Sequence, residues 1–297
     1  NNENKWMEVR VKDWKLIKNI SLQYGFRYSA SGVYVCNIND LKLACKVTNK
    51  VTKWFGVNNR KVNWNKWGVK SFGGTDYNIN SIDFLFIDID RVHKEDTATI
   101  KDLENANKLA DIILDKLKEQ NWNKNYCKIC SGNGVQLLIK LDVPIRMPNV
   151  EFNSLGKYYE DNNEFNKMRR IIPEGIGKDI LKFCKKYKEE LGVEVDKSVF
   201  NIGRVGALPF TKNFKFDGFT WRGIVELKID GVNEGLTDYI MSKEEDIHLY
   251  NSKKVFVTHS IHRKNIIKFG QLKDNPIIKL MLENDLPHGA INNKLWF

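Results

Sequence analysis

Phe84-Leu85-Phe86-Ile87-Asp88-Ile89-Asp90 is the stretch of sequence that decides the fold. Four large apolar residues run directly into two aspartates separated by one residue, which predicts a short strand buried on both faces. Side chains alternate along a strand, so Asp88 and Asp90 should project from the same face at its carboxyl end. Two carboxylates held about 6–7 Å apart along the backbone repel each other unless a cation lies between them. Hard divalent ions such as Mg²⁺ or Mn²⁺ take oxygen ligands of this kind, which predicts a metal site; a polar turn with two solvated acids is the alternative.

The composition is that of a basic globular chain. Its 297 residues are 42% hydrophobic and 11% aromatic, which is ample for one large or two modest cores. No stretch approaches 18 consecutive apolar residues and the start, Asn1-Asn2-Glu3, is polar, so we expect neither a membrane span nor a signal peptide. The first residue is not Met and Leu295-Trp296-Phe297 ends inside an apolar stretch, so we expect the chain to be part of a longer protein.

The cysteines point to a reducing compartment. Five cysteines are an odd number in a long chain, so we expect a cytoplasmic location. The spacing Cys127-x-x-Cys130 could suit zinc, but it lies in a strand-like segment, where residues three apart face opposite sides. The pair His259 and His262 lies far downstream, so we do not expect a structural zinc site.

Positive charge is concentrated at the two ends of the chain. The net charge is +11; residues 1–80 hold 14 Lys/Arg against 5 Asp/Glu, and residues 251–297 hold 8 against 3, which leaves the middle at −3. The basic N-terminal segment also carries five tryptophans: Trp6, Trp14, Trp54, Trp64 and Trp67. Cations interleaved with aromatic rings favour a polyanion with stackable bases. A solvated lysine-rich surface is the alternative.

Helices and strands are mixed along the chain, which is typical of an α+β fold rather than a doubly wound one. Apolar spacing predicts helices over residues 6–24, from a cap at Asp96 or Thr97 to Leu117, over 177–191, and over 276–283 in the tail. Strands are predicted over residues 32–36, 41–47, 53–57, 126–130, 135–141, 200–210 and 223–229. Long loops are predicted over residues 63–80 and 149–166.

Two further motifs follow the acidic strand. Ser131-Gly132-Asn133-Gly134 joins two predicted strands, and its alternate glycines let the backbone fold tightly and hold phosphate oxygens on exposed N–H groups. The alternative is an ordinary hairpin turn, of which Asn-Gly is the commonest. Further on, Asp196 follows an apolar pair as Asp88 does, and could be the third carboxylate of a metal site. Downstream, Arg204 and Lys212 are placed to meet anionic phosphates.

Taken together and in this order, these motifs resemble those of the archaeo-eukaryotic primase superfamily. The likeness is closest to the primase-polymerases encoded by plasmids and viruses, and it spans about residues 30–230. It implies an α+β catalytic core in residues 1–252, in which an RRM-like sheet packs with a second α/β subdomain. The stretch from Asn275-Pro276 to Asn293 is similar to the small helical domain that follows the core, so residues 253–297 are expected to begin a template-recognition domain.

The resemblance also implies roles for single residues. In the family the first and third motifs supply metal-binding carboxylates, matched here by Asp88, Asp90 and Asp196, which would hold two Mg²⁺ or Mn²⁺ ions. The segment ending in Asn59-Arg60 looks like the family's strand ending in Asn-Pro-Arg. The implied nucleotide-binding residues are Arg60, Ser131, Gly132, Asn133, Gly134, Gln136, Arg204 and Lys212.

The chain departs from the family pattern at three positions. Gln136 stands where the family usually has a histidine, and an amide can donate a hydrogen bond to phosphate but carries no positive charge. Ala207 replaces a second arginine, and Phe210 replaces the glycine that often follows Leu208-Pro209. These changes bear on nucleotide affinity more than on the fold.

The activity that the resemblance implies is that of a DNA primase or DNA-directed polymerase of a plasmid- or virus-like replicon. Such an enzyme transfers a nucleotide from a (d)NTP to a 3′-hydroxyl on a single-stranded DNA template, and a helicase domain often follows it. Two alternatives share the fold: a non-catalytic replication initiator that binds single-stranded DNA, and a repair or damage-bypass polymerase. A third is an unrelated α+β domain.

Overall fold

The computed structural model describes residues 7–28, 32–48, 51–60, 76–94, 96–148, 163–215 and 218–243. Contacts divide the chain into residues 1–247 and residues 248–297. The second part lies outside the described residues, and so does the helical domain predicted for residues 253–297. The predicted loops also lie largely outside them, at residues 63–75 and 149–162.

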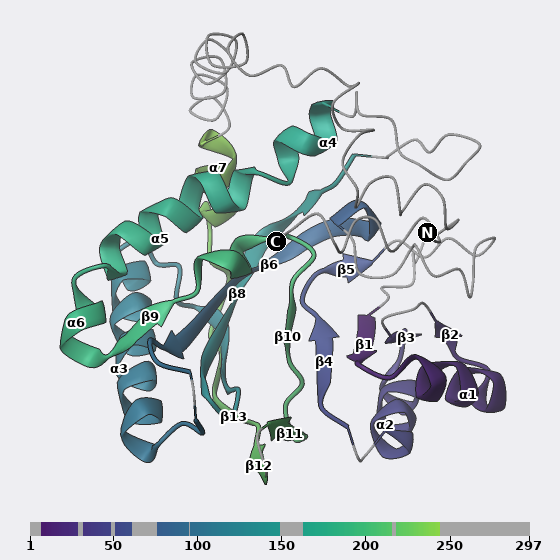
Figure 1. Cartoon of the computed structure of the whole chain (residues 1–297). Helices are drawn as coiled ribbons and strands as arrows, with labels where there is room; N and C mark the ends of the chain where they lie inside the picture. Colours follow the sequence, from purple (N-terminus) through teal and green to yellow (C-terminus); the bar gives the residue numbers. More distant parts are fainter. Residues whose placement is uncertain are drawn as a thin grey trace, which may run out of the picture. The chain divides into compact units, whose positions relative to one another are not determined.

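The described residues form two main antiparallel sheets and the two-stranded hairpin of β11 (Lys212–Lys215) and β12 (Gly218–Trp221), and the larger main sheet carries the acidic strand (Figure 1). Its strand order is β13-β7-β8-β6-β5, and β9 pairs with β6 as well. The strands are β5 (Asn59–Arg60), β6 (Ile79–Arg91), β7 (Asn125–Cys130), β8 (Gly134–Arg146), β9 (Val193–Val195) and β13 (Gly223–Ile229). The predicted acidic strand is therefore the carboxyl-terminal half of β6, a 13-residue strand that runs through the middle of the sheet.

The smaller sheet has the order β10-β4-β1-β3-β2. Its strands are β1 (Met7–Val11), β2 (Arg27–Tyr28), β3 (Gly32–Val35), β4 (Lys53–Gly56) and β10 (Val205–Ala207). Helices α1 (Trp14–Tyr24) and α2 (Ile38–Val47) lie beside it (Figure 1). Ile17 and Ile20 of α1 and Ala44 of α2 pack with Val9 and Val33 of the strands, so this sheet has a core of its own.

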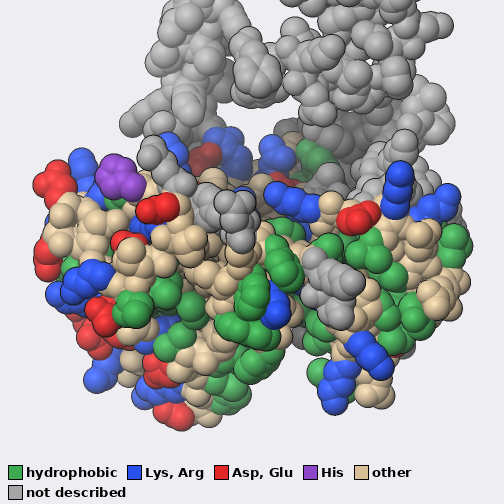
Figure 2. Space-filling model, turned by 60° about the horizontal axis from the view of Figure 1, so that its bottom comes forward, with side chains coloured by type: hydrophobic (Ala, Val, Ile, Leu, Met, Phe, Trp, Pro, Cys, Tyr) green, Lys and Arg blue, Asp and Glu red, His purple; other side chains and the backbone are tan. Residues whose placement is uncertain are grey.

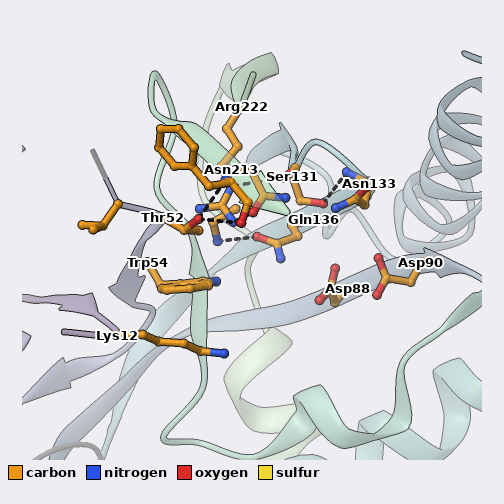
Figure 3. A pocket seen from close by; sticks show the side chains of 13 residues that line it. Lys12, Thr52, Trp54, Asp88, Asp90, Ser131, Asn133, Gln136, Asn213 and Arg222 are labelled. Carbon is orange, nitrogen blue, oxygen red and sulfur yellow. Dashed lines mark hydrogen bonds between the residues drawn. The ribbon is translucent and has the colours of Figure 1, made fainter. Parts of the chain in front are cut away.

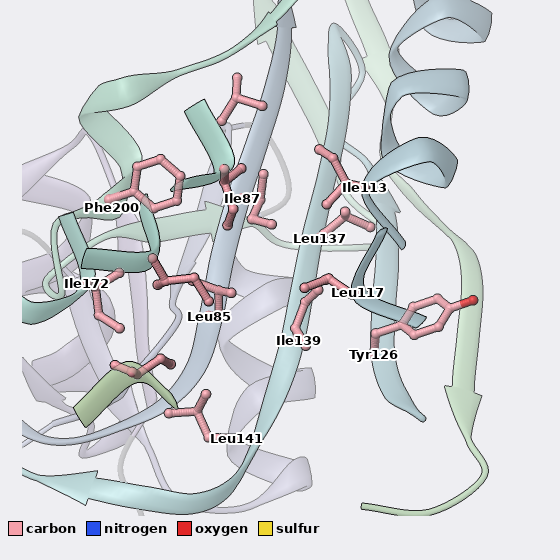
Figure 4. Close-up of a cluster of buried hydrophobic side chains, with 14 of the residues drawn as sticks. Leu85, Ile87, Ile113, Leu117, Tyr126, Leu137, Ile139, Leu141, Ile172 and Phe200 are labelled. Carbon is pink, nitrogen blue, oxygen red and sulfur yellow. The ribbon is translucent and has the colours of Figure 1, made fainter. Parts of the chain in front are cut away.

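The main core lies between the larger sheet and the helices on one of its faces. Leu85 and Ile87 of β6 and Leu137 of β8 meet Ile113 of helix α3 (Ile100–Lys118) there, and all are nearly fully buried (Figure 4). Phe86 and Leu138 point to the opposite face, where they form a separate small cluster. Both faces of the acidic strand are thus buried, as the apolar run predicted.

The remaining elements complete the described part. They are η2 (Asp76–Asn78), α4 (Asn163–Met168), η3 (Ile172–Ile176), α5 (Gly177–Cys184), α6 (Tyr187–Leu191), η4 (Lys197–Phe200) and α7 (Leu236–Ser242). Antiparallel sheets and helices alternate along the chain, so the α+β class is confirmed. None of the described helices combines the length and the apolar character that a membrane span requires.

Several predicted elements were wrong in type or extent. Residues 41–47 belong to helix α2, because Asn37 accepts a hydrogen bond of 2.9 Å from the Asp40 amide and caps it. The predicted helix over residues 6–24 begins only at Trp14, and the alternating residues Met7–Val11 before it form β1. Helix α3 is capped by Thr99, in a capping box with Asp102, rather than by Asp96 or Thr97.

Candidate functional site

The carboxylates of Asp88, Asp90 and Asp196 meet at the carboxyl end of β6. One oxygen from each lies within 4.8 Å of the other two. The short strand β9 brings the third acid there, because it pairs antiparallel with β6 through Ile89 and Val195. The amide of Asp196 then donates a hydrogen bond of 2.9 Å to the carbonyl oxygen of Asp88. Acids more than a hundred residues apart in sequence are therefore held together by backbone pairing.

The outer two acids have cationic or N–H partners. Lys94 lies 2.8 Å from an oxygen of Asp90. Asp196 accepts a hydrogen bond of 2.8 Å from the amide of Ser198, and Arg204 lies 3.6 Å from its other oxygen. The Oδ1 atom of Asp88, by contrast, is buried and has no hydrogen-bond partner among the described residues.

This arrangement separates the pKa values of the acids. Burial, followed by the charge of Asp90, raises the pKa of Asp88 to about 7, although a hydrogen bond from Gln136 opposes the rise. Burial also acts to raise the pKa of Asp196, but the Ser198 hydrogen bonds and the charges of Lys94 and Arg204 hold that pKa below its ordinary value. The inner carboxyl group thus resists ionisation, while Asp196 favours its charged form.

The residues fit a hard divalent cation. Three carboxylates within 4.8 Å of one another offer an all-oxygen donor set. The buried Oδ1 of Asp88 lacks the partner that a buried polar atom normally has, and a cation would satisfy it. The cluster could therefore bind a metal ion.

A cleft of about 480 Å³ opens beside the acids (Figure 3). Asp88 and Asp90 lie at one end of it in Figure 3, and Lys12, Trp54 and Arg222 lie toward the other. Its lining residues are Lys12, Val51, Thr52, Trp54, Asp88, Asp90, Ser131, Asn133, Gln136, Ala207, Asn213, Phe214 and Arg222. Elements of both sheets form its walls, so a ligand in this cleft would contact opposite charges at its two ends.

The Ser131–Gly134 turn lies at the cleft and is tight, as its glycines predicted. The Ser131 amide donates a hydrogen bond of 2.9 Å to the Gly134 carbonyl oxygen. A Cβ on Gly134 would lie 2.1 Å from the Ile89 carbonyl oxygen and 2.8 Å from an Asp90 carboxylate oxygen. Gly134 therefore lets strand β8 pass directly against the acidic end of β6. Ser131 and Asn133 line the cleft; their proposed contact with phosphate stays a prediction.

Two of the positions that depart from the family pattern are bonded to each other. Gln136 lies opposite Asp88 in the β6–β8 register, and its Oε1 accepts a hydrogen bond of 2.7 Å from the Ala207 amide. Because Ala207 belongs to β10 of the smaller sheet, this bond joins the two sheets at the cleft. The Gln136 amide thus lies between a cleft acid and the neighbouring sheet, and its side chain is 6% exposed.

The third position that departs from the pattern, Phe210, has a strained backbone. Phe210 has a φ of 59°, in the left-handed region that favours glycine, and its ring is 75% exposed. Its amide donates a hydrogen bond of 2.9 Å to the Arg222 carbonyl oxygen, which fixes this conformation at the start of the β11–β12 hairpin.

The structure places three basic side chains that were predicted to contact the nucleotide outside the cleft lining: Arg60, Arg204 and Lys212. Arg60 is buried, lies 3.2 Å from a carboxylate oxygen of Glu8, and donates a hydrogen bond of 2.9 Å to the Gly203 carbonyl oxygen. Lys212 points along the outer face of the hairpin, with its Nζ 3.9 Å from the ring centre of Phe219. Neither side chain lines the cleft, so we assign Arg60 to the junction of the two sheets and Lys212 to the hairpin surface. Arg204 lies 3.6 Å from a carboxylate oxygen of Asp196, and its contact with phosphate stays a prediction.

Sequence reasoning missed Arg222, which is buried in the cleft wall. Its guanidinium donates hydrogen bonds to the carbonyl oxygens of Ser131, at 3.1 Å, and Lys53, and to the side-chain oxygen of Asn213, at 3.1 Å. All three acceptors are neutral, and burial lowers the pKa of Arg222 to about 10. A lone arginine before a glycine carries no recognisable signal in the sequence. Trp54, also at the cleft, was part of the basic aromatic segment that suggested a polyanion.

Comparisons with known proteins give little beyond this description. No protein-family model matches the chain, and no curated protein matches it. Among solved structures, the crystal structure of primase RepB′ is similar to it with a TM-score of 0.38 and 8% sequence identity. That match covers 88% of this chain and 64% of the other, so the chain spans less than two thirds of that protein's length.

Proposed function

We propose that this chain is a template-directed nucleotidyltransferase, a DNA primase or polymerase, whose catalytic centre is Asp88, Asp90 and Asp196. The observation that carries the proposal is the convergence of three carboxylates from two paired strands within 4.8 Å, beside a cleft with cations at its far end. The order of the motifs in the sequence, which resembles that of primase-polymerases, supports the same assignment.

The three acids would hold divalent metal ions, and Mg²⁺ and Mn²⁺ suit such oxygen ligands. When bound, these ions supply Lewis-acid activation of a 3′-hydroxyl and neutralise charge on the leaving pyrophosphate. The hydrogen bond from Asp196 to Asp88 keeps two of the ligands in register. Lys94 and Arg204 would orient Asp90 and Asp196 through the contacts described above.

The remaining cleft residues would bind the triphosphate. The backbone of the Ser131–Gly134 turn offers N–H donors, and the buried Arg222 offers a cation whose protein hydrogen-bond acceptors are all neutral. Charge that develops on phosphoryl oxygens during transfer would be stabilised by such fixed donors. Reaction at this site needs positioning and electrostatics, and no protein nucleophile.

The test is an extension assay on primed and unprimed single-stranded templates, with deoxy- or ribonucleotides and Mg²⁺ or Mn²⁺. Asp88→Asn and Asp90→Asn should reduce incorporation to background, while Asp115→Asn, an exposed acid on α3, should leave it unchanged. Binding of Mn²⁺, followed by calorimetry, should be lost in the same two variants, and binding of single-stranded DNA should be retained. Polymerisation by either variant at the wild-type rate would refute the assignment.

A second candidate is a non-catalytic initiator that binds single-stranded DNA. It is favoured by Gln136, whose Oε1 is committed to the Ala207 amide and which brings no positive charge to the cleft. If the unmodified chain binds the template but incorporates no nucleotide under any of these conditions, this second function replaces the first.

A further inference from the structure

The hairpin formed by β11 and β12 has two faces of opposite character. Its register pairs Lys212 with Trp221, Asn213 with Thr220 and Phe214 with Phe219. Because side chains alternate along each strand, Asn213 and Thr220 share one face. Lys212, Phe214, Phe219 and Trp221 share the other, which we call the aromatic face.

The polar face is fixed against the cleft wall. Asn213 is 6% exposed and accepts a hydrogen bond of 3.1 Å from Arg222, which continues the same face. The Thr220 side chain packs so closely against Gly132 that a Cβ there would lie 2.2 Å from its hydroxyl oxygen. Thr52, which directly precedes β4 of the smaller sheet, accepts a hydrogen bond of 2.8 Å from the Phe214 amide. These contacts anchor the hairpin to both sheets, so its aromatic face is held in a fixed position beside the cleft.

The aromatic face is open to solvent. Phe214 is 40%, Phe219 47% and Trp221 62% exposed. Their rings form a continuous row, with centroids 6.0 Å apart for Phe214 and Phe219 and 5.9 Å apart for Phe219 and Trp221. Figure 2, with the lower end of Figure 1 turned forward, shows hydrophobic side chains gathered near the middle of this side of the molecule. Contiguous exposed rings of this kind mark an interaction surface, since the hairpin is already held by its polar face.

The charges around these rings suit a polyanion. The Nζ of Lys212 lies 3.9 Å from the ring centre of Phe219 and 5.1 Å from that of Trp221. Residues 205–223 hold the three cations Lys212, Lys215 and Arg222 against one acid, Asp217. A row of rings with a cation beside it matches the alternation of bases and phosphates in a single strand.

We propose that the aromatic face of the hairpin binds single-stranded nucleic acid, with bases stacked on Phe219 and Trp221 and a phosphate on Lys212. The inference rests on the proposed function in one respect: the bound strand would be the template that leads into the acidic cleft. Binding itself needs neither nucleotide nor metal, so it can be tested separately from nucleotidyl transfer.

The test is the affinity of the full chain for a fluorescently labelled oligo(dT) of about 20 nucleotides, measured by polarisation in EDTA over a range of salt. Phe219→Ala/Trp221→Ala should weaken binding by about thirtyfold or more, because it removes the rings on which two bases stack. Lys212→Met should lower the slope of log affinity against log salt by about one. Ile229→Ala, which removes an equally exposed apolar side chain from β13, should bind like the wild type.

A duplex of the same length separates stacking from charge. Its bases are already stacked, so the aromatic variant should lose little affinity for it. Unchanged affinity for the single strand in Phe219→Ala/Trp221→Ala, or an equal loss for the duplex, would overturn the inference. A change of oligomeric state in that variant without a change in DNA affinity would assign the face to contact between protein copies. The conservative variant Trp221→Phe keeps a ring in place and should retain most of the affinity even if the double variant folds poorly.

Discussion

The backbone amide of Asp196 donates a hydrogen bond of 2.9 Å to the backbone carbonyl oxygen of Asp88. This bond continues the pairing of β9 with β6 by one residue and ends it at the two acids. The position of the third carboxylate therefore depends on the main chain rather than on a flexible side chain. Side-chain substitutions at any one acid should leave the other two in place, which allows each to be tested singly.

Neutralising Asp88 should stabilise the metal-free protein at high pH. Its pKa is about 7 in the folded chain against an ordinary value of 3.8, so the proton is bound more tightly in the folded state. The stability that this proton provides is complete below pH 3.8 and is lost as the pH rises toward 7. In EDTA at pH 8, Asp88→Asn should therefore raise the free energy of unfolding by up to about 4 kcal/mol.

Thermal melts at pH 5 and pH 8 check this prediction. The difference between variant and wild type should be smaller at pH 5, where the folded wild type keeps the proton. Added Mn²⁺ should raise the melting temperature of the wild type at pH 8 and not that of the variant. A variant less stable than the wild type at pH 8 would show that burial of Asp88 does not strain the fold.

Gly134→Ala should be strongly destabilising. The new methyl group would lie 2.1 Å from the Ile89 carbonyl oxygen, a backbone atom that cannot move without separating β6 from β8. We expect a loss of about 2–4 kcal/mol in the free energy of unfolding, as for other large steric clashes in a core. Gly223→Ala is the matched control, because a Cβ there meets nothing within 4 Å. Urea denaturation of the two variants should separate them; equal midpoints would contradict the close approach of the strands.

The acidic strand and its neighbours could be predicted from sequence because their signals are local. The apolar run Phe84–Ile87 indicates a strand buried on both faces. Because side chains alternate along a strand, Asp88 and Asp90 are predicted to share one face. The strand at residues 41–47 was wrong because short apolar segments fit either period, and the cap at Asn37 decides for a helix. A single sequence does not indicate which distant strands pair with each other, as β10 pairs with β4.

Site residues could be predicted only where their own segment of sequence indicates their role, without knowledge of distant partners. The three acids could be found from their place after apolar strands. The ion pair of Arg60 with Glu8 could not be predicted, because Glu8 lies on a different strand 52 positions earlier and a buried ion pair looks in the sequence like any two charged residues. Arg222 was missed for the same reason: its role depends on three acceptors from three other segments.

Arg60→Met should act on stability rather than on nucleotide affinity. The guanidinium and the Glu8 carboxylate are both fully buried, and removing one partner of such a pair costs about 3–5 kcal/mol when the other loses its only counter-charge. Glu8 keeps its ion pair of 3.1 Å with Arg10, so the loss in Arg60→Met should lie at or below the lower end of that range. Replacing both, as in Glu8→Gln/Arg60→Met, should recover part of the loss. The measurements are the free energy of unfolding and the KM for nucleotide. A raised KM with unchanged stability would instead place Arg60 in the nucleotide site.

Two substitutions of Gln136 should separate its two contacts. Gln136→Met leaves the buried Ala207 amide without its acceptor, which should cost about 1–3 kcal/mol at any pH. Gln136→Glu keeps an acceptor oxygen but places a second negative charge opposite Asp88. That variant should melt near the wild type at pH 5, where the extra carboxyl group can stay protonated, and well below it at pH 8.

The pH dependence is the distinguishing result, because Glu at position 136 can gain a charge between pH 5 and pH 8, whereas Met at that position cannot. If both Gln136 variants lose the same stability at both pH values, the hydrogen bond to Ala207 accounts for the whole effect and Asp88 is not sensitive to its neighbour. If Gln136→Glu is destabilised only at pH 8, and added Mn²⁺ restores its melting temperature, the repulsion between residue 136 and Asp88 is relieved by a cation. A neutral side chain at position 136 would then be compatible with metal binding. The Gln136 amide adds no negative charge beside the acids, and its hydrogen bond to Ala207 joins the cleft to the smaller sheet.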